Sequence, residues 1–311
     1  MRDLLESLRT QTRPPDEVVI CDGGSTDRTV KAIEDFPGCG VQIRVVRSGP
    51  AFPGRARNLA IRAAGCELIA LTDAGVRLDR RWLEHLMAPF QAPTSPEVVY
   101  GNFEPMKRSF WQRCIGIAFV PPRDPHSRLR GPTVASMAMH YKVWEYLGGF
   151  REDLRSAEDL LFIKGIARGG FLVRYAPDAL VFWDPPRDFR AAFRRFSMYS
   201  YSNIRAGLAQ SWQVPVLRTY VLMGVLTSIA WWTPLGFLAP LALLAVRAMK
   251  RVVREMGVPS LCNIPVLIGV MVALVTIDCA TLDGCRRWLT TDWNFRVRQA
   301  RSLAGRDRTE A

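Results

Sequence analysis

Two apolar, β-branched segments of this 311-residue chain each stop at an aspartate that a glycine soon follows. They read Val-Val-Ile-Cys-Asp-Gly-Gly at residues 18–24 and Leu-Ile-Ala-Leu-Thr-Asp-Ala-Gly at residues 68–75. Such runs are typical of buried parallel strands that open into a loop at the carboxyl end. Ligands bind at that edge of an open α/β sheet. The pair therefore predicts a site that contains Asp22 and Asp73.

Helix and strand patterns alternate along the first two thirds of the chain. Strands are predicted at residues 17–21, 41–46, 67–72, 98–103, 171–175 and 180–183. Helices are predicted at residues 27–35, 55–64, 80–88, 141–147 and 157–168. This alternation predicts an α/β domain with a mostly parallel central sheet covered by helices.

Five motifs, in this order, resemble those of the inverting family 2 glycosyltransferases. They are Asp-Gly-Gly-Ser-Thr-Asp at 22–27, Gly-Arg-Ala-Arg-Asn-Leu-Ala at 54–60, Asp-Ala-Gly at 73–75, Gly-Gly-Phe-Arg-Glu at 148–152 and Ser-Ala-Glu-Asp at 156–159. The resemblance implies a GT-A-like nucleotide-diphospho-sugar transferase domain. It also implies an enzyme that moves a sugar from a nucleotide-diphosphate sugar, UDP-linked rather than GDP-linked, to an acceptor with inversion.

One strand of the resembling family is missing. In that family a strand precedes the helix that Leu4, Leu5 and Leu8 predict here, and no such run stands ahead of this helix. Loss of a central strand leaves unpaired backbone groups and a gap in the core. Three alternatives stay open: a native start upstream of Met1, a truncated and inactive transferase relative, or a membrane scaffold that only binds nucleotide.

The resemblance assigns the donor-binding residues. Asp22 corresponds to the carboxylate that accepts the ring N–H of uracil or guanine, and Gly24 belongs to the same loop. Arg57 and Asn58 stand in the second motif and are predicted to bind the nucleotide sugar, with Asn58 supporting its loop. Asp27 is expected to cap the following helix.

Asp73 occupies the first acidic position of the family's metal-binding motif. Hard cations such as Mg²⁺ or Mn²⁺ prefer carboxylate and phosphate oxygens, so the resemblance implies a divalent cation held by Asp73. The motif is incomplete, because Gly75 and Val76 stand where the family has further aspartates. Alternatively Arg57 neutralises part of the diphosphate charge, since a guanidinium matches phosphate geometry.

The catalytic base is predicted in the last motif. An inverting displacement needs a base on the acceptor side, and by resemblance Asp159 is that base. Glu158 beside it is predicted to contact the acceptor or the backbone. Carboxylates at a helix start are also favoured by the helix dipole, so a capping role for Asp159 is the alternative.

Charge and composition predict a membrane partner. The chain carries a net charge of +13, and its arginines collect beside apolar stretches. That distribution is typical of cytoplasmic loops and of attraction to anionic headgroups, so no nucleic-acid partner is expected. The seven cysteines show no Cys-x-x-Cys spacing, which indicates reduced thiols. We expect location at the cell membrane with the catalytic domain on the cytoplasmic side.

Three regions follow from these patterns. Residues 1–210 form the catalytic domain and end in an amphipathic interfacial helix at 187–206, where aromatic and arginine residues interleave at helical spacing. Residues 211–285 form transmembrane or re-entrant helices, and residues 286–311 a basic tail. Residues 214–246 are compatible with two alternatives, one long kinked span or a tight helical hairpin. The expected acceptor is a lipid-linked or other saccharide near the bilayer.

Overall fold

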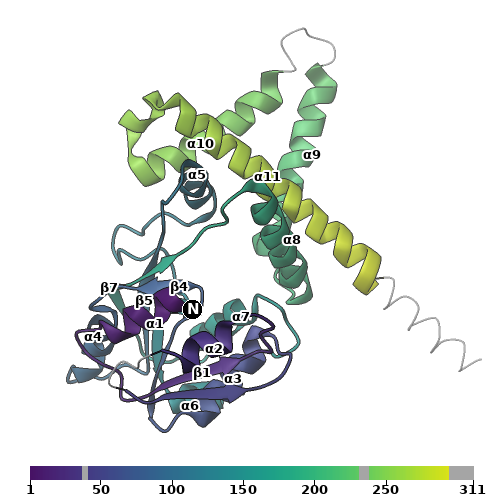
Figure 1. The fold of residues 1–311 in the computed structure, drawn as a ribbon. Helices are drawn as coiled ribbons and strands as arrows, with labels where there is room; N and C mark the ends of the chain where they lie inside the picture. Colours follow the sequence, from purple (N-terminus) through teal and green to yellow (C-terminus); the bar gives the residue numbers. More distant parts are fainter. Residues whose placement is uncertain (37–40, 231–237, 294–311) are drawn as a thin grey trace, which may run out of the picture.

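The computed structural model describes residues 1–36, 41–230 and 238–293. An α/β part is followed by long helices that pack beside it (Figure 1). The α/β part contains α1 (Arg2–Arg9), β1 (Val18–Asp22), α2 (Thr29–Glu34), β2 (Ile43–Arg47), α3 (Pro53–Ala63), β3 (Leu68–Leu71), β4 (Val76–Leu78), α4 (Trp82–Met87), β5 (Val98–Pro105), α5 (Phe110–Phe119), β6 (Met137–His140), α6 (Tyr141–Tyr146), α7 (Glu158–Arg168) and β7 (Val173–Trp183). The long helices are α8 (Phe189–Arg205), α9 (Gln213–Ala230), α10 (Leu238–Met256) and α11 (Ile264–Trp288).

The strands form two sheets. β1 and β2 pair in parallel, and a five-stranded sheet has the order β3-β6-β5-β7-β4. In the larger sheet only β5 and β7 are parallel, so the prediction of a mostly parallel sheet is not confirmed. Every antiparallel pairing involves β4 or β6, two short strands that the sequence pattern did not predict.

Among the described residues, β1 and β3 each have one edge without a strand partner. Val18 N donates to Gln42 O, and Ser48 N donates to Asp22 O, both at 3.1 Å. Because backbone groups alternate between the two edges of a strand, this register turns the backbone N–H and C=O groups of Val19 and Cys21 away from β2. All five residues of β1 remain partly exposed, although the run is apolar up to Asp22.

The free edge of β3 follows from its antiparallel register. Tyr141 N donates to Glu67 O at 2.7 Å, which turns the backbone groups of Leu68 and Ala70 away from β6. A cavity of about 990 Å³ is lined by residues 18–21 of β1 and by all of β3. The two sheets thus border one cavity.

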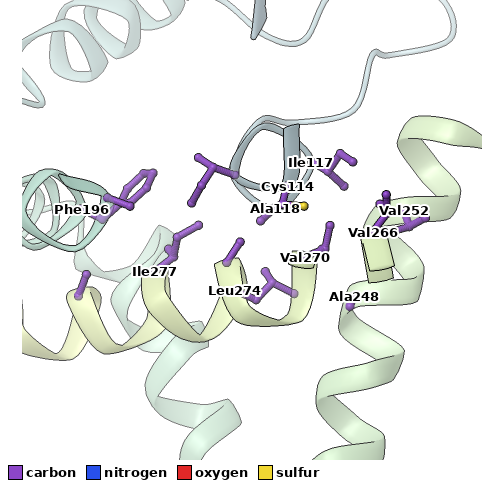
Figure 2. Close-up of a cluster of buried hydrophobic side chains, with 14 residues drawn as sticks. Cys114, Ile117, Ala118, Phe196, Ala248, Val252, Val266, Val270, Leu274 and Ile277 are labelled. Atoms are coloured by element: carbon purple, nitrogen blue, oxygen red, sulfur yellow. The ribbon is translucent and has the colours of Figure 1, made fainter. Parts of the chain in front are cut away.

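Two apolar cores cover the faces of the larger sheet, and a third joins it to the long helices. Figure 2 shows Cys114, Ile117 and Ala118 of α5 facing Val270 and Leu274 of α11. A methyl group at Gly269 of α11 would lie 2.5 Å from the Cys114 sulfur, so only glycine permits this approach. The helix α5, which lies between β5 and β6 in sequence, therefore anchors the helical region.

A buried ion-pair cluster makes a second connection. Arg130 is 6% exposed and donates to Glu104 of β5 at 2.9 Å. Its other guanidinium nitrogens donate to Glu255 of α10 at 2.8 and 2.9 Å. Arg130 therefore links the end of the sheet to the end of α10.

The long helices correspond to part of the region that the sequence predicts to contact the membrane. The helix predicted at 187–206 is α8, and residues 214–246 contain α9 and α10, while residues 231–237 lie outside the described ranges. In the described part, one helix is long and apolar enough to cross a membrane, Ile264–Asp292, and half of its most apolar stretch is buried in the protein. The predicted basic tail lies largely outside the described residues.

Candidate active site

Arg57 lies at the centre of a cluster of carboxylates. The α3 helix carries it to the end of β3 and the start of α7, where its side chain is 17% exposed. Its Nη2 donates to Asp73 Oδ1 at 2.7 Å, and its Nη1 donates to Glu158 Oε1. Burial alone would lower the pKa of Arg57, but Asp73 and Glu158 outweigh burial and raise that pKa above its ordinary value. Arg57 therefore stays positively charged.

Glu158 is a buried carboxylate with one oxygen left over. It is 4% exposed, and its Oε2 has no hydrogen-bond partner within the described residues. Burial raises the pKa of Glu158, and the attraction of Arg57 only partly offsets that effect. Its Oε2 is therefore available for a hydrogen bond with a hydroxyl group of a ligand.

Asp159 follows directly and is partly buried. Burial raises the pKa of its carboxyl group, while Arg57 acts in the opposite direction. Its Oδ1 accepts the backbone N–H of Leu160 at 2.8 Å, but Ala157 is the N-cap of α7 and no side chain caps this helix, so the alternative of a capping role is not observed. Asp73 and Asp159 line the same cavity, the one that borders the free strand edges.

Ala157 holds the two carboxylates in place through an unusual backbone. It is the N-cap of α7 and adopts φ 73° and ψ 1°, the left-handed region that costs a non-glycine residue roughly 1–2 kcal/mol. Such strain persists only where the surroundings impose it and is common at functional sites.

Asn58 is a positioning residue. It is 2% exposed, and its amide nitrogen donates to Phe150 O and to Glu152 Oε1, both at 2.9 Å. Its oxygen accepts from Trp144 Nε1 at 3.0 Å and from Phe150 N at 2.8 Å. Both donor and both acceptor positions are filled. Its predicted support of the loop agrees with this geometry, and binding of the nucleotide sugar by Asn58 stays a prediction.

The loop that Asn58 holds fits closely against α3. A methyl group at Gly54 would lie 1.9 Å from Arg151 O, and one at Gly149 would lie 2.7 Å from the Asn58 oxygen. Gly149 also has φ 80°, a conformation that favours glycine. Since Arg57 lies between Gly54 and Asn58 on α3, this packing fixes its position relative to α7.

Asp22 ends β1 and shapes its own loop. Its carboxylate accepts backbone N–H groups of Gly24 and Ser25 at 3.2 to 3.3 Å, and the Ser25 side chain, with these backbone bonds, holds the pKa of Asp22 below the usual range. Gly24 has φ 88°, and a methyl group there would lie 2.9 Å from Pro50 N. Asp27 accepts from Thr29 N at 2.9 Å and so contacts the start of α2, but the N-cap of that helix is Arg28, not Asp27 as predicted. Asp22 does not line the cavity that Asp73 and Asp159 share, so base recognition by Asp22 stays a prediction.

Four residues that line this cavity each have a buried polar atom without a partner in the described part of the chain. Sequence reasoning missed three of the residues: Thr72, Ser156 and Asn203, the fourth being Glu158. Asn203 is 3% exposed and comes from α8, far along the chain from the motifs. Buried polar atoms are normally paired, so four orphans around one cavity indicate the place of a polar ligand.

The residues offer one carboxylate oxygen to a divalent cation. No group of three or more His, Cys, Asp or Glu side chains among the described residues could hold a metal by itself. Asp73 is 43% exposed and uses only Oδ1 for Arg57. Asp73, Glu158 and Asp159 around one guanidinium leave two negative charges in excess when all are ionised. A cation that also binds phosphate oxygens fits this charge balance.

Residues 1–140 match the family described as glycosyl transferase family 2. The chain is 28% identical over 272 residues to the pre-mycofactocin glycosyltransferase of Mycobacterium tuberculosis, which covers 82% of this chain and 55% of that protein. It is 26% identical over 209 residues to the O-antigen chain rhamnosyltransferase of Salmonella typhimurium, covering 62% of this chain and 65% of that protein. The chain thus spans about half the length of the first relative.

A solved structure shares the fold. The mannosyltransferase of Pyrobaculum calidifontis, in complex with GDP-Man and Mn²⁺, superposes with a TM-score of 0.58 at 21% sequence identity. The match covers 90% of this chain and 82% of that one. It supports the predicted α/β GT-A-like fold.

Proposed function

We propose that this chain, whose residues 1–140 match glycosyl transferase family 2, transfers a sugar from a nucleotide-diphosphate sugar to an acceptor with inversion. UDP is the favoured nucleotide and GDP the alternative. The observation that carries the proposal is the shared cavity, in which Arg57 joins Asp73 to Glu158 beside four unpartnered polar atoms. A sugar offers hydroxyl groups for those atoms, and a diphosphate matches the guanidinium.

The leaving diphosphate needs positive charge. Arg57 supplies one charge and is held in place by Asp73 and Glu158. Asp73 would hold a divalent cation, Mg²⁺ or Mn²⁺, through its second oxygen together with phosphate oxygens and water. When bound, such a cation neutralises the charge that develops on the leaving group. Arg57 orients the diphosphate on the same side.

Asp159 is the proposed base. The acceptor oxygen forms a bond to the anomeric carbon of the sugar while the bond from that carbon to the phosphate oxygen breaks. The acceptor proton passes to the carboxylate of Asp159, whose raised pKa makes it a stronger base than an ordinary aspartate. Attack opposite the leaving group inverts the anomeric configuration. Glu158 Oε2 accepts a hydrogen bond from a hydroxyl group of the sugar or of the acceptor.

The acceptor is proposed to lie at a membrane. The apolar α11 and the arginine-rich α8 pack against the α/β part through α5, so a bilayer that holds them also holds the cavity nearby. A lipid-linked saccharide or polyprenyl phosphate suits that position. The catalytic domain then lies on the cytoplasmic side of the cell membrane.

A panel of radiolabelled nucleotide sugars tests the function. Membranes from expressing cells are incubated with each donor, with Mg²⁺, Mn²⁺ or EDTA, and lipid-extractable label is counted. Label that depends on one donor and is lost in Asp159→Asn supports a transferase. Donor binding without transfer in the native chain would indicate the nucleotide-binding scaffold, and neither binding nor transfer the inactive relative.

A further inference from the structure

A second cavity lies among the long helices, away from the catalytic cluster. Its volume is about 740 Å³, within the range of small-molecule sites, and it is lined by the first turns of α8, by Leu244 of α10 and by one face of α11. Its apolar wall consists of Phe193, Leu244, Ile268, Met271, Val272 and Val275. We call this cavity the helical groove.

Two arginines stand at the helical groove. Arg190 and Arg194 are both exposed and lie four residues apart on α8, which places them on one face of the helix. Neither has an ion-pair partner among the described residues, and no acidic side chain lines the groove. The nearby Asp188 caps α8 and accepts from Ala191 N at 2.8 Å. The groove therefore joins an apolar wall to two uncompensated positive charges.

We propose that the helical groove binds one lipid that carries a phosphate at the head of a long apolar chain. The chain would cover the exposed side chains of Ile268 and Val272, which are 55% and 49% exposed. The phosphate would accept hydrogen bonds from the guanidinium groups of Arg190 and Arg194, since arginine pairs with phosphate in two parallel hydrogen bonds. A neutral lipid would leave the arginines unused, and free phosphate would leave the apolar wall uncovered.

The helical groove and the catalytic cavity lie on different faces of α8. Tyr199 and Asn203 line the catalytic cavity, whereas Arg190 and Arg194 line the groove. At about 3.6 residues per turn, the step from Arg194 to Asn203 is about two and a half turns, which places these side chains on opposite sides of the helix. The groove is therefore a lipid site separate from the acceptor site of the proposed function.

Native mass spectrometry of the full chain in detergent tests the proposal without any donor. Dioleoyl phosphatidic acid is titrated against the native chain, with dioleoylglycerol and inorganic phosphate as separate probes. The double variant Arg190→Gln/Arg194→Gln removes the charges, and Val272→Trp fills the groove. Arg168→Gln/Arg174→Gln, which removes two exposed arginines of the α/β part, and Val225→Trp on α9 are the matched controls.

The native chain and both controls are expected to hold one phosphatidic acid molecule. Loss of two arginines should weaken that binding by roughly 30-fold, and Val272→Trp should weaken it by at least as much. Equal binding of dioleoylglycerol, full displacement by inorganic phosphate, or unchanged binding in both groove variants would overturn the proposal. Since no donor is present, failure of sugar transfer with lipid binding intact would count only against the proposed function.

Discussion

Arg57 Nη2 and Asp73 Oδ1 lie 2.7 Å apart, although 16 residues and a strand separate them in the chain. The contact sets how the site handles charge. One oxygen of Asp73 is committed to a protein cation, and the other remains for a metal or solvent. Arg57 in turn bridges to Glu158, so α3, β3 and α7 are held together by one side chain.

Replacing Asp159 with Asn should abolish transfer while donor binding persists. Loss of a general base lowers the rate by roughly 10²- to 10⁴-fold. Turnover of the donor found in the radiolabel panel measures the rate, and calorimetry measures donor affinity. Asp153→Asn, which changes an exposed carboxylate paired with Arg151, is the control and should transfer normally. Normal turnover in Asp159→Asn would refute the assigned base.

The acid limb of the pH profile should lie above the ordinary aspartate pKa of about 3.9. Burial raises the pKa of Asp159, so protonation and loss of the base occur at a higher pH as the solution is acidified. Arg57→Gln removes the charge that lowers this pKa and should shift the acid limb of kcat/KM further upward. Arg57→Lys keeps the charge and should shift it less. A limb that moves downward in Arg57→Gln would contradict this electrostatic account.

Asn58→Ala should reduce stability more than donor affinity. The change leaves the buried N–H groups of Trp144 and Phe150 without their acceptor, which costs about 3 kcal/mol in the free energy of unfolding. Urea unfolding measures that cost, and calorimetry on the folded protein measures donor affinity. A large loss of affinity at unchanged stability would instead mean that Asn58 contacts the donor.

Arg130→Met should uncouple α10 from the sheet. It leaves the largely buried Glu104 and Glu255 with only the half-exposed Arg123 and Lys107 as partners, at a cost of about 3 kcal/mol. Arg123 also pairs with Glu104 but is half exposed, so Arg123→Gln should cost less than about 1 kcal/mol. Chemical denaturation compares the two. Equal costs would show that burial of Arg130 does not matter.

An apolar strand grafted ahead of Met1 should stabilise the fold. Met1 lines the cavity that borders β1 and β3, so a five-residue Val/Ile strand with a short loop can reach the free edges. Pairing there would satisfy both edges and bury their side chains, raising the thermal midpoint by about 5 °C or more. A Gly/Ser segment of equal length is the control. If both extensions gave the same midpoint, the edges would not accept a strand.

The sequence by itself determined the local structure and the order of the motifs. The apolar run that ends at Asp22 forms β1, and the run that precedes Asp73 forms β3. The glycines of the 148–152 loop indicate the turn that precedes α7. These features depend on neighbouring residues, whose spacing is readable along the chain. Asp159, Glu158, Arg57 and Asp73 were all identified from their motifs, and the structure brings them to one cavity.

Only the tertiary structure decided strand direction, which side chains are saturated, and which distant residues join the site. The short strands β4 and β6 supply every antiparallel pairing, and strand direction depends on partners that a local pattern does not specify. Asn58 proved to be saturated because a loop some 90 residues later closes around it. Asn203 of α8 lines the cavity because α8 packs against the other long helices and α5. That packing depends on the burial of apolar surface over the whole chain, which a local pattern does not specify.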